Sequence, residues 1–326
     1  MAKGIGLISG GLDSMLAVCI LQEQGIDVHG ISFETPFFNA SRGRKVAKNF
    51  GIPFTALDIT QTHMPIVKSP KYGYGKNMNP CIDCHSLMFR TAGKVMEDIG
   101  ADFIFSGEVL GQRPKSQTSQ AMRLVARASG YQEHIIRPLS AKLLPITKLE
   151  EEGIVDRSRL LDLQGRSRRP QIELAKKYGL TDWESPAGGC LLTYAGFSKK
   201  LREQLDHDPD TPERDLRLLK VGRHFRLPSG EKLVMGKNMD NNETIESSLT
   251  DNDIVLSPVT LAGPTAIIPN AKSDEDITLA SRILLRYCKN VEESEVLICW
   301  PTQNISRTIT VAPLSPENSV QYLIVL

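Results

Sequence analysis

Short hydrophobic runs alternate with segments of helical periodicity over the first 180 residues. The pattern predicts strand 4–9, helix 12–24, strand 28–33, helix 42–50, strand 54–58, helix 84–99, strand 103–106, and helices 119–129 and 170–178. Buried strands separated by helices are typical of βαβ units, in which helices cover both faces of a parallel sheet. Ligands of such sheets bind beyond the carboxyl ends of the strands, so the loops after Ile8, Phe33 and Phe105 are the informative ones.

The pattern becomes strand-rich in the last third of the chain. It predicts a connector with glycine and proline over 181–215, then strands 224–227, 232–235, 254–257 and 266–268, a helix 275–289 and three further apolar strands that end with 322–326. We therefore predict the fold class α/β, with a parallel-sheet domain over 1–180, a connector over 181–215 that carries Cys190, and a smaller α+β domain over 216–326.

Length and composition agree with two globular domains. The chain has 326 residues, of which 40% are hydrophobic and 24% charged. The N-terminus resembles neither a signal nor a transit peptide, and no apolar stretch is long enough for a membrane span, so we expect a soluble cytoplasmic protein without a membrane partner.

The net charge of +1 conceals a net −7 over 239–326, which leaves +8 for the preceding residues. Such asymmetry suggests an anionic partner for the first part, although solvated surface charge explains it equally well.

The loop 9–14, of sequence Ser-Gly-Gly-Leu-Asp-Ser, ends one buried strand and opens a helix. Gly10 and Gly11 let the backbone approach a phosphate group, the helix N-terminus offers free N–H donors, and Ser9 and Ser14 add hydroxyl groups. Asp13 would repel phosphates unless a divalent cation such as Mg²⁺ lies between them. The alternative is a plain strand-to-helix turn with a capping aspartate.

This loop resembles the PP-loop of N-type ATP pyrophosphatases, which cleave ATP to AMP and pyrophosphate. The resemblance implies a parallel-sheet PP-loop domain in which Ser9, Gly10, Gly11, Asp13 and Ser14 hold ATP, and Ser32 and Phe33 lie beside the adenine. The loop alone also fits relatives of GMP synthetase, NAD synthetase and asparagine synthetase.

A second stretch, Ser-Gly-Glu-Val-Leu-Gly-Gln over 106–112 with Ser-Gln-Thr over 116–118, resembles the tRNA 4-thiouridine synthases. That resemblance implies tRNA as a partner, with Gly107 and Gln112 at the nucleotide. Arg-Pro-Leu over 137–139 followed by Lys142 resembles the next segment of the same family, which makes Lys142 a candidate catalytic residue at the leaving pyrophosphate. The alternative for Lys142 is a solvated loop lysine.

The better-known members of that family carry THUMP and rhodanese domains, which this sequence lacks, so we expect tRNA binding and sulfur delivery to come from other segments. The sequence over 222–227 and 234–238 resembles the RNA-binding module of NFACT proteins and implies phosphate contacts by Arg223, Arg226, Lys232 and Lys237. A basic run over 157–177 is a second candidate for RNA phosphates, with a solvated surface as its alternative.

Cys81 and Cys84 form a C-x-x-C-H pattern, and Cys190 follows two glycines. Haem attachment normally needs export, which leaves three hypotheses: a [4Fe–4S] cluster, zinc, or a catalytic persulfide or disulfide pair. Three cysteines on a cluster would leave one iron open for an exogenous hydrosulfide, an arrangement that resembles cluster-dependent tRNA thiolases. The other cysteines, Cys19, Cys288 and Cys299, are predicted to be buried structural thiols.

The sequence thus predicts an ATP-dependent tRNA sulfurtransferase that forms 4-thiouridine and uses a sulfide or persulfide donor, with Asp13, Lys142, Cys81, Cys84 and Cys190 in the chemistry. The alternatives are a tRNA 2-thiouridine synthase, a PP-loop ligase acting on a small molecule, and a non-catalytic RNA-binding protein. The sequence leaves the oligomeric state open.

Overall fold

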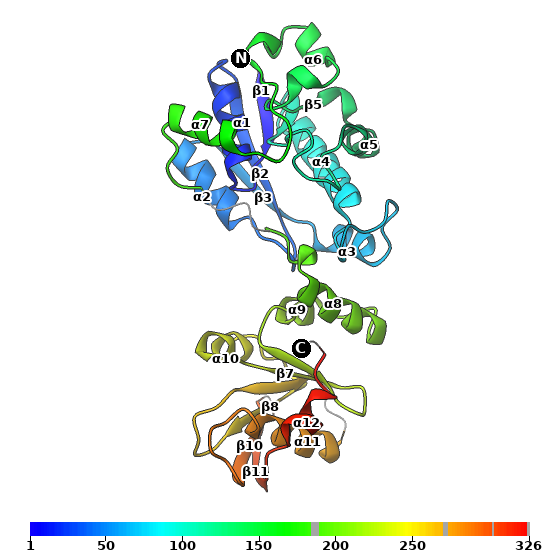
Figure 1. Ribbon diagram of the computed structural model, residues 1–326, viewed down its shortest axis with the longest axis vertical. Helices are drawn as coiled ribbons and strands as arrows, with labels where there is room; N and C mark the ends of the chain where they lie inside the picture. The colour runs from blue at the N-terminus through cyan, green and yellow to red at the C-terminus, as the bar shows by residue number, and fades with distance from the viewer. Residues whose placement is uncertain (184–188, 270–272, 302, 325–326) are drawn as a thin grey trace. The chain divides into compact units, whose positions relative to one another are not determined.

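The computed structural model describes residues 1–183, 189–269, 273–301 and 303–324. The chain divides into two compact units, Met1–Tyr194 and Ala195–Leu326, each with its own sheet (Figure 1). The division falls inside the segment predicted as a connector.

The first unit contains five strands and seven α-helices with short 3₁₀ turns between them, within the described part of the chain. In chain order these are β1 (Lys3–Leu7), α1 (Leu12–Gln22), β2 (Asp27–Glu34), α2 (Ser41–Phe50), β3 (Phe54–Asp58), α3 (Thr60–Lys68), α4 (Cys81–Asp98), β4 (Phe103–Ser106), α5 (Ser119–Ser129), β5 (Ile135–Ile136), α6 (Lys148–Glu151) and α7 (Arg169–Lys177).

The sheet of this unit is parallel throughout, with strand order β3-β2-β1-β4-β5. Alternate residues of one strand enter different cores. Phe103 and Phe105 of β4 pack with α1, α2 and α7 on one face, whereas Ile104 packs with α3, α4 and α5 on the other. Because both faces are covered, apolar residues of the strands are buried on both sides of the sheet, and the predicted α/β class is confirmed.

The order of the strands creates a switch point beside β1. The chain adds β2 and β3 on one side of β1 and then returns to place β4 on the other side. The loops that leave β1 and β4 therefore diverge at the carboxyl edge of the sheet, where ligands of such sheets bind. These are two of the three loops that the sequence singled out.

The second unit holds six strands and five α-helices in the residues that the structure covers. They are α8 (Ala195–His207), α9 (Glu213–Leu218), β6 (Arg223–Arg226), β7 (Lys232–Met235), α10 (Met239–Glu246), β8 (Asp253–Pro258), β9 (Ala266–Pro269), α11 (Asp274–Leu285), β10 (Ser294–Trp300), β11 (Ile305–Val311) and α12 (Pro316–Val320). The sheet is antiparallel, in the order β11-β10-β8-β9-β7-β6. Helix α11 packs on one face, and Ile245 of α10 on the other. The predicted α+β domain is confirmed.

Several element predictions need correction. Helix α4 begins at Cys81, three residues before the predicted start, and α3 was not predicted because Pro65 and polar residues interrupt its pattern. The segment 195–207, predicted as connector, forms α8. The described residues of the predicted last strand, 322–324, form a turn with one β-bridge, Phe225 to Leu323, because α12 precedes them; residues 325–326 lie outside the described residues.

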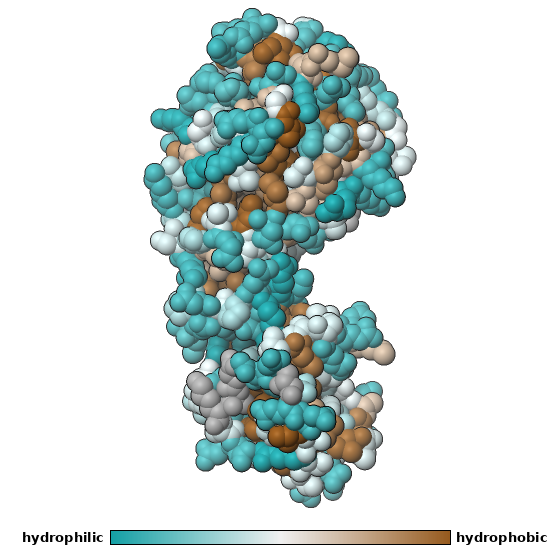
Figure 2. Space-filling view, turned by 180° about the vertical axis from the view of Figure 1, so that it is seen from behind, coloured by the Kyte–Doolittle hydropathy of each residue, from teal (hydrophilic) through white to brown (hydrophobic). Residues whose placement is uncertain are grey.

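Hydrophilic residues cover most of the face seen in Figure 2, with hydrophobic residues showing between them in small groups. Among the residues that the structure describes, no helix is both long and apolar enough to cross a membrane.

Gly43 of α2 supplies the first test. A Cβ there would lie 2.2 Å from Ser32 Oγ and 2.4 Å from Ile8 O, so Gly43→Ala must push α2 away from the ends of β1 and β2. We expect this overpacking to lower the free energy of unfolding by about 1–3 kcal/mol in chemical denaturation followed by circular dichroism. The control is Gly196→Ala in α8, where an added Cβ meets nothing within 4 Å. A Gly43→Ala variant as stable as the wild type would contradict the close packing.

Candidate functional site

The turn after β1 is shaped by two glycines. Gly10 has φ +80°, and a Cβ on it would lie 2.4 Å from Arg42 Cβ, so another side chain would be both strained and blocked. Gly11 precedes α1 in extended conformation, and its carbonyl oxygen accepts the Ser14 hydroxyl at 2.8 Å. Since the first N–H groups of a helix have no partner within it, the start of α1 presents donors suited to an anion.

Asp13 is held from two sides. Its Oδ2 accepts a hydrogen bond from Gln112 Nε2 at 2.8 Å and lies 3.6 Å from Arg168 Nη2. Gln112 Oε1 in turn accepts from Gln171 Nε2 at 3.0 Å. The other oxygen, Oδ1, is buried and has no partner within the described residues. An orphaned carboxylate oxygen beside an anion-binding turn fits a ligand of Mg²⁺.

Gly107, directly after β4, packs against this turn. A Cβ on Gly107 would lie 2.4 Å from Asp13 C and 2.5 Å from Ser14 N, so only glycine brings β4 this close to α1. The predicted role of Gly107 was close approach to the nucleotide; what the structure shows is close approach to the Asp13 backbone.

Glu108 follows and is buried. Its carboxylate accepts from Arg137 Nε at 2.8 Å and lies 2.9 Å from His85 Nδ1, with a weaker bond from Ser106 Oγ at 3.2 Å. Burial by itself would raise the pKa of Glu108, but the Arg137 guanidinium and His85 reverse this effect and bring the pKa to about 2. Glu108 is therefore an ionised carboxylate that joins β4 to α4.

The first turn of α4 carries two of the three predicted thiols. Cys84 is buried and Cys81 is partly exposed. Burial raises the pKa of Cys84 well above its usual range, and the thiols of Cys190 and Cys81 raise it further. Burial also raises the pKa of Cys190 to about 11, with Cys81 contributing. The three thiols are thus electrostatic neighbours, although Cys190 lies more than 100 residues after Cys81 and Cys84 in sequence.

Loop contacts bring the Cys190 segment to α4. Leu191 N donates to Phe37 O at 3.0 Å, and Asn77 Nδ2 donates to Thr193 O at 2.7 Å. Asn79 Nδ2 points to Cys81 Sγ at 3.1 Å. The loop before α4 therefore contacts both cysteine segments. The residues 184–188 that precede Cys190 lie outside the described residues.

The three thiols fit a metal in chemical type but not in spacing for one ion. Zinc–thiolate bonds of about 2.3 Å in a tetrahedron bring sulfur atoms to within about 4 Å of one another. Among the residues that the structure describes, no group of three or more His, Cys, Asp or Glu side chains is arranged to hold a metal ion.

The remaining predicted residues have other partners. Ser32 is buried and its hydroxyl donates to Ile8 O, while Phe33 belongs to the core on the α4 face. Lys142 Nζ donates to Ser158 O at 2.8 Å and is an electrostatic neighbour of Asp156. The roles of Ser32, Phe33 and Lys142 at the nucleotide stay predictions.

Several side chains of the basic run 157–177 contact other residues of the first unit. Arg157 pairs with Glu150 at 2.5 Å, Arg159 donates to Glu23 O, and Arg168 lies at Asp13. Arg166, Arg169 and Lys176 are exposed. Arg168 thus belongs to the Asp13 turn, although the sequence suggested RNA phosphates.

Sequence reasoning missed the structural roles of several residues. Glu108, Arg137 and His85 were noticed only as parts of motifs, whereas Gln171 gave no signal. A buried carboxylate at this place could have been suspected only from the position of Glu108 two residues after a buried strand. Cys19, Cys288 and Cys299, predicted to be buried, are partly exposed.

Comparisons with known proteins support both halves of the sequence analysis. Residues 1–143 match the family model described as thiamine biosynthesis protein (ThiI), and residues 222–323 match the NFACT protein RNA-binding domain. The chain therefore carries a domain of each kind, and both resemblances are confirmed at that level.

Two curated relatives are named tRNA-specific 2-thiouridylase MnmA. The protein of Clostridium acetobutylicum is 35% identical over 31% of this chain and 34% of its own length, and that of Methylobacterium nodulans is 27% identical over 43% and 42%. The chain thus spans less than half the length of these relatives. A crystal structure described as a 4-thiouridine synthetase–RNA complex with bound ATP aligns at 20% identity and TM-score 0.38, over 67% of this chain and 52% of that one.

Glu108→Gln tests the buried network. Because the pKa of Glu108 lies near 2 and its ordinary value is 4.5, its charge stabilises the fold above pH 4.5, and this contribution is lost as the pH falls from about 4.5 towards 2. Glu108→Gln should remove that pH dependence and lower the free energy of unfolding at pH 7 by about 3–5 kcal/mol, because Arg137 stays buried without its charged partner.

The control for this measurement is Glu152→Gln. Its pair with Lys148 spans 3.4 Å at the surface, so the change should be below about 0.5 kcal/mol. If the stability of Glu108→Gln at pH 7 matched that of the control, the charge of Glu108 would not contribute to the stability of the fold.

Proposed function

We propose that the protein is an ATP-dependent tRNA sulfurtransferase that activates a uridine carbonyl oxygen and replaces it with sulfur, forming 4-thiouridine. The observation that carries the proposal is a direct connection between the turn suited to phosphates and the cysteine thiols. Gly107 packs on the anion-binding turn, the next residue, Glu108, binds His85, and His85 follows Cys84 in α4. Two adjacent residues that directly follow β4 thus link the turn to the thiols.

The first step takes place at the turn. Backbone N–H groups at the start of α1 hold the phosphates of ATP, and Asp13 Oδ1 offers a ligand for Mg²⁺. The uridine oxygen attacks the α-phosphorus, a P–O bond forms, and the bond to the leaving pyrophosphate breaks. Arg168, beside Asp13, adds positive charge where negative charge develops on pyrophosphate.

The second step uses a sulfur nucleophile at the activated carbon. Hydrosulfide attacks that carbon, a C–S bond forms, the C–O bond to AMP breaks, and a proton is released to solvent. No oxidant or reductant is needed. The buried position of Cys84 beside Cys81 and Cys190 lets the site exclude water, which would otherwise hydrolyse the activated uridine.

We further propose that Cys81, Cys84 and Cys190 hold a [4Fe–4S] cluster, which when bound would supply an open iron for hydrosulfide. One observation supports a bound group over a free thiolate or persulfide carrier. Burial raises the pKa of Cys84 and of Cys190, which disfavours a free thiolate near pH 7, whereas metal-bound thiols are deprotonated.

The second unit would then hold the tRNA. Its match to an RNA-binding domain covers 222–323, which is most of the unit. We propose tRNA as the partner of this unit.

Substitution of the thiols separates the two steps. Cys84→Ser and Cys190→Ser should lower tRNA thiolation by about 100-fold or more and leave tRNA-dependent pyrophosphate release within about threefold. Asp13→Asn should lower both rates, because it acts on the first step. Thiolated nucleosides are measured by mass spectrometry, pyrophosphate by a coupled assay, and iron and sulfide in anaerobically purified protein.

Cys288→Ser, in the second unit, is the matched control and should change neither rate. Wild-type thiolation by the Cys190→Ser variant, or thiolation at the full rate by protein shown to lack iron, would overturn the sulfur route. Pyrophosphate release that needs no tRNA would favour a ligase acting on a small molecule.

A second candidate, formation of 2-thiouridine, is supported by the curated relatives named 2-thiouridylase. Mass spectrometry of tRNA from a deletion strain distinguishes the two. We expect loss of 4-thiouridine and unchanged 2-thiouridine; the reverse result would assign the protein to 2-thiouridine.

A further inference from the structure

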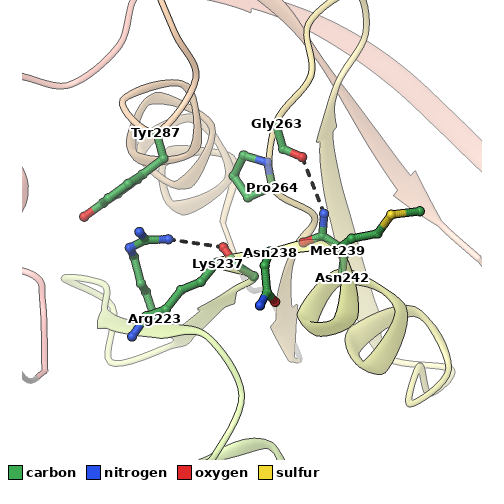
Figure 3. Close-up of a pocket in the computed structure, with 9 residues that line it drawn as sticks. Arg223, Lys237, Asn238, Met239, Asn242, Gly263, Pro264 and Tyr287 are labelled. Atoms are coloured by element: carbon green, nitrogen blue, oxygen red, sulfur yellow. Dashed lines mark hydrogen bonds between the residues drawn. The ribbon is translucent and has the colours of Figure 1, made fainter.

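A cavity of about 330 Å³ opens in the second unit. Residues from β6, the start of α10, the loop before β9 and the segment after α11 line it (Figure 3). Its polar and aromatic lining includes Arg223, Lys237, Asn238, Asn242 and Tyr287. We call it the Arg223 pocket.

Arg223 is positioned but not neutralised. Its guanidinium carbon lies 4.3 Å from the centre of the Tyr287 ring, and Nη1 donates to Gly236 O at 3.3 Å, as the dashed line in Figure 3 shows. A second guanidinium, that of Arg286, lies 5.2 Å from the same ring, and its Nε is buried without a partner in the described structure. The ring thus orients cations whose N–H donors are not used by a carboxylate.

The other two predicted phosphate contacts behave differently. Arg226 donates to both carboxylate oxygens of Glu203, at 2.7 and 2.9 Å. Lys232 is buried and donates to Gln204 Oε1 at 2.7 Å. Arg226 and Lys232 therefore stabilise the packing of α8 on the sheet, and their prediction as RNA contacts is not supported. Within the described residues, no ion pair involves Arg223 or Lys237.

Arg223 and Lys237 bring positive charge to the pocket. Burial and the positive charge of Lys237 together lower the pKa of the nearby Lys200 to about 8. Burial also takes the pKa of His224 well below its usual range, and Lys232, Lys200 and Lys237 all act in the same direction. The residues after 239 are acidic on average, but the cavity is lined by Arg223 and Lys237 and by no carboxylate among the described residues, so an anion bound there would be attracted by both.

The opposite wall supplies neutral hydrogen-bonding groups. The Asn238 side chain caps α10, and Asn242 accepts from Thr265 N at 3.1 Å while donating weakly to Gly263 O. A Cβ on Gly236 would lie 2.0 Å from Asn242 Oδ1, so only glycine at this position lets the Asn242 side chain pack against the residue that follows β7. The start of α10 faces the same cavity and adds backbone donors (Figure 3).

We propose that the Arg223 pocket binds one nucleotide of an unpaired RNA segment through its backbone phosphate, with Arg223 and Lys237 on the phosphate oxygens and Asn242 beside the sugar or base. The cavity has the size of a single small ligand and is concave, which suits an extruded nucleotide and not the surface of a duplex. This inference rests on the proposed function, because it makes the pocket the place where tRNA is held.

The test uses the full-length protein and a fluorescently labelled single-stranded RNA in anisotropy titrations over a series of salt concentrations. Arg223→Gln and Lys237→Gln should each weaken binding about tenfold and reduce the slope of log K against log salt by about 0.7, the value for one phosphate on a single strand. With tRNA as substrate, the same variants should raise KM and leave kcat unchanged.

Lys289→Gln is the charge-matched control, because Lys289 is exposed two residues after Tyr287 and does not line the cavity. It should change binding less than twofold. Tyr287→Phe keeps the ring under Arg223 and should bind as the wild type does, whereas Tyr287→Leu should weaken binding. Circular dichroism and thermal unfolding confirm that each variant is folded.

The outcomes separate the two proposals. Wild-type protein that binds neither the labelled RNA nor tRNA would overturn the proposed function together with the pocket. Wild-type binding with no difference between Arg223→Gln, Lys237→Gln and Lys289→Gln would overturn the pocket alone. If Arg223→Gln and Lys237→Gln weakened the binding of a labelled duplex RNA as much as that of the single-stranded RNA, the preference for an unpaired segment would be overturned.

Discussion

The ion pairs of the buried Glu108 carboxylate are the interaction on which the candidate site depends. A carboxylate in an apolar interior is tolerated only with cationic partners, and Glu108 has Arg137 on one side and His85 on the other. Because His85 follows Cys84 and Glu108 follows Gly107, satisfying one buried charge fixes the thiol helix against the turn that would bind ATP. Movement of α4 by a few ångströms would break the contact between His85 and Glu108.

The electrostatics of the two halves of the site are opposite. At the turn, Asp13 has one oxygen held by Gln112 near Arg168 and one oxygen without a partner, an arrangement that accepts a cation. At α4, Cys84 is buried beside the partly exposed Cys81 and Cys190, and burial raises the pKa of Cys84 and of Cys190. A group that binds thiolates would have to displace those protons, so metal binding and pH are linked there.

The second unit contrasts with the first in how it uses arginine. Arg226 is neutralised by Glu203 and belongs to the packing, whereas Arg223, three residues earlier in the same strand, is oriented by an aromatic ring and has no carboxylate partner within the described residues. Residues three apart in a strand point to opposite faces of the sheet, which explains how one short motif supplies both a structural guanidinium and one that lines a cavity.

The sequence by itself determined the parallel sheet, most of its strands and helices and the loop 9–14, because periodicity and glycine spacing are local properties of the chain. It also singled out Cys81, Cys84 and Cys190. Only the tertiary structure decided which side chains meet. Arg168 reaches Asp13, Glu108 joins His85 to Arg137, and Tyr287 orients Arg223, each across a wide gap in sequence. Polar helices such as α8 also escaped prediction, since packing and not periodicity stabilises them. Pairings of this kind depend on where the strands end and on which charges are buried together, and no local pattern records either.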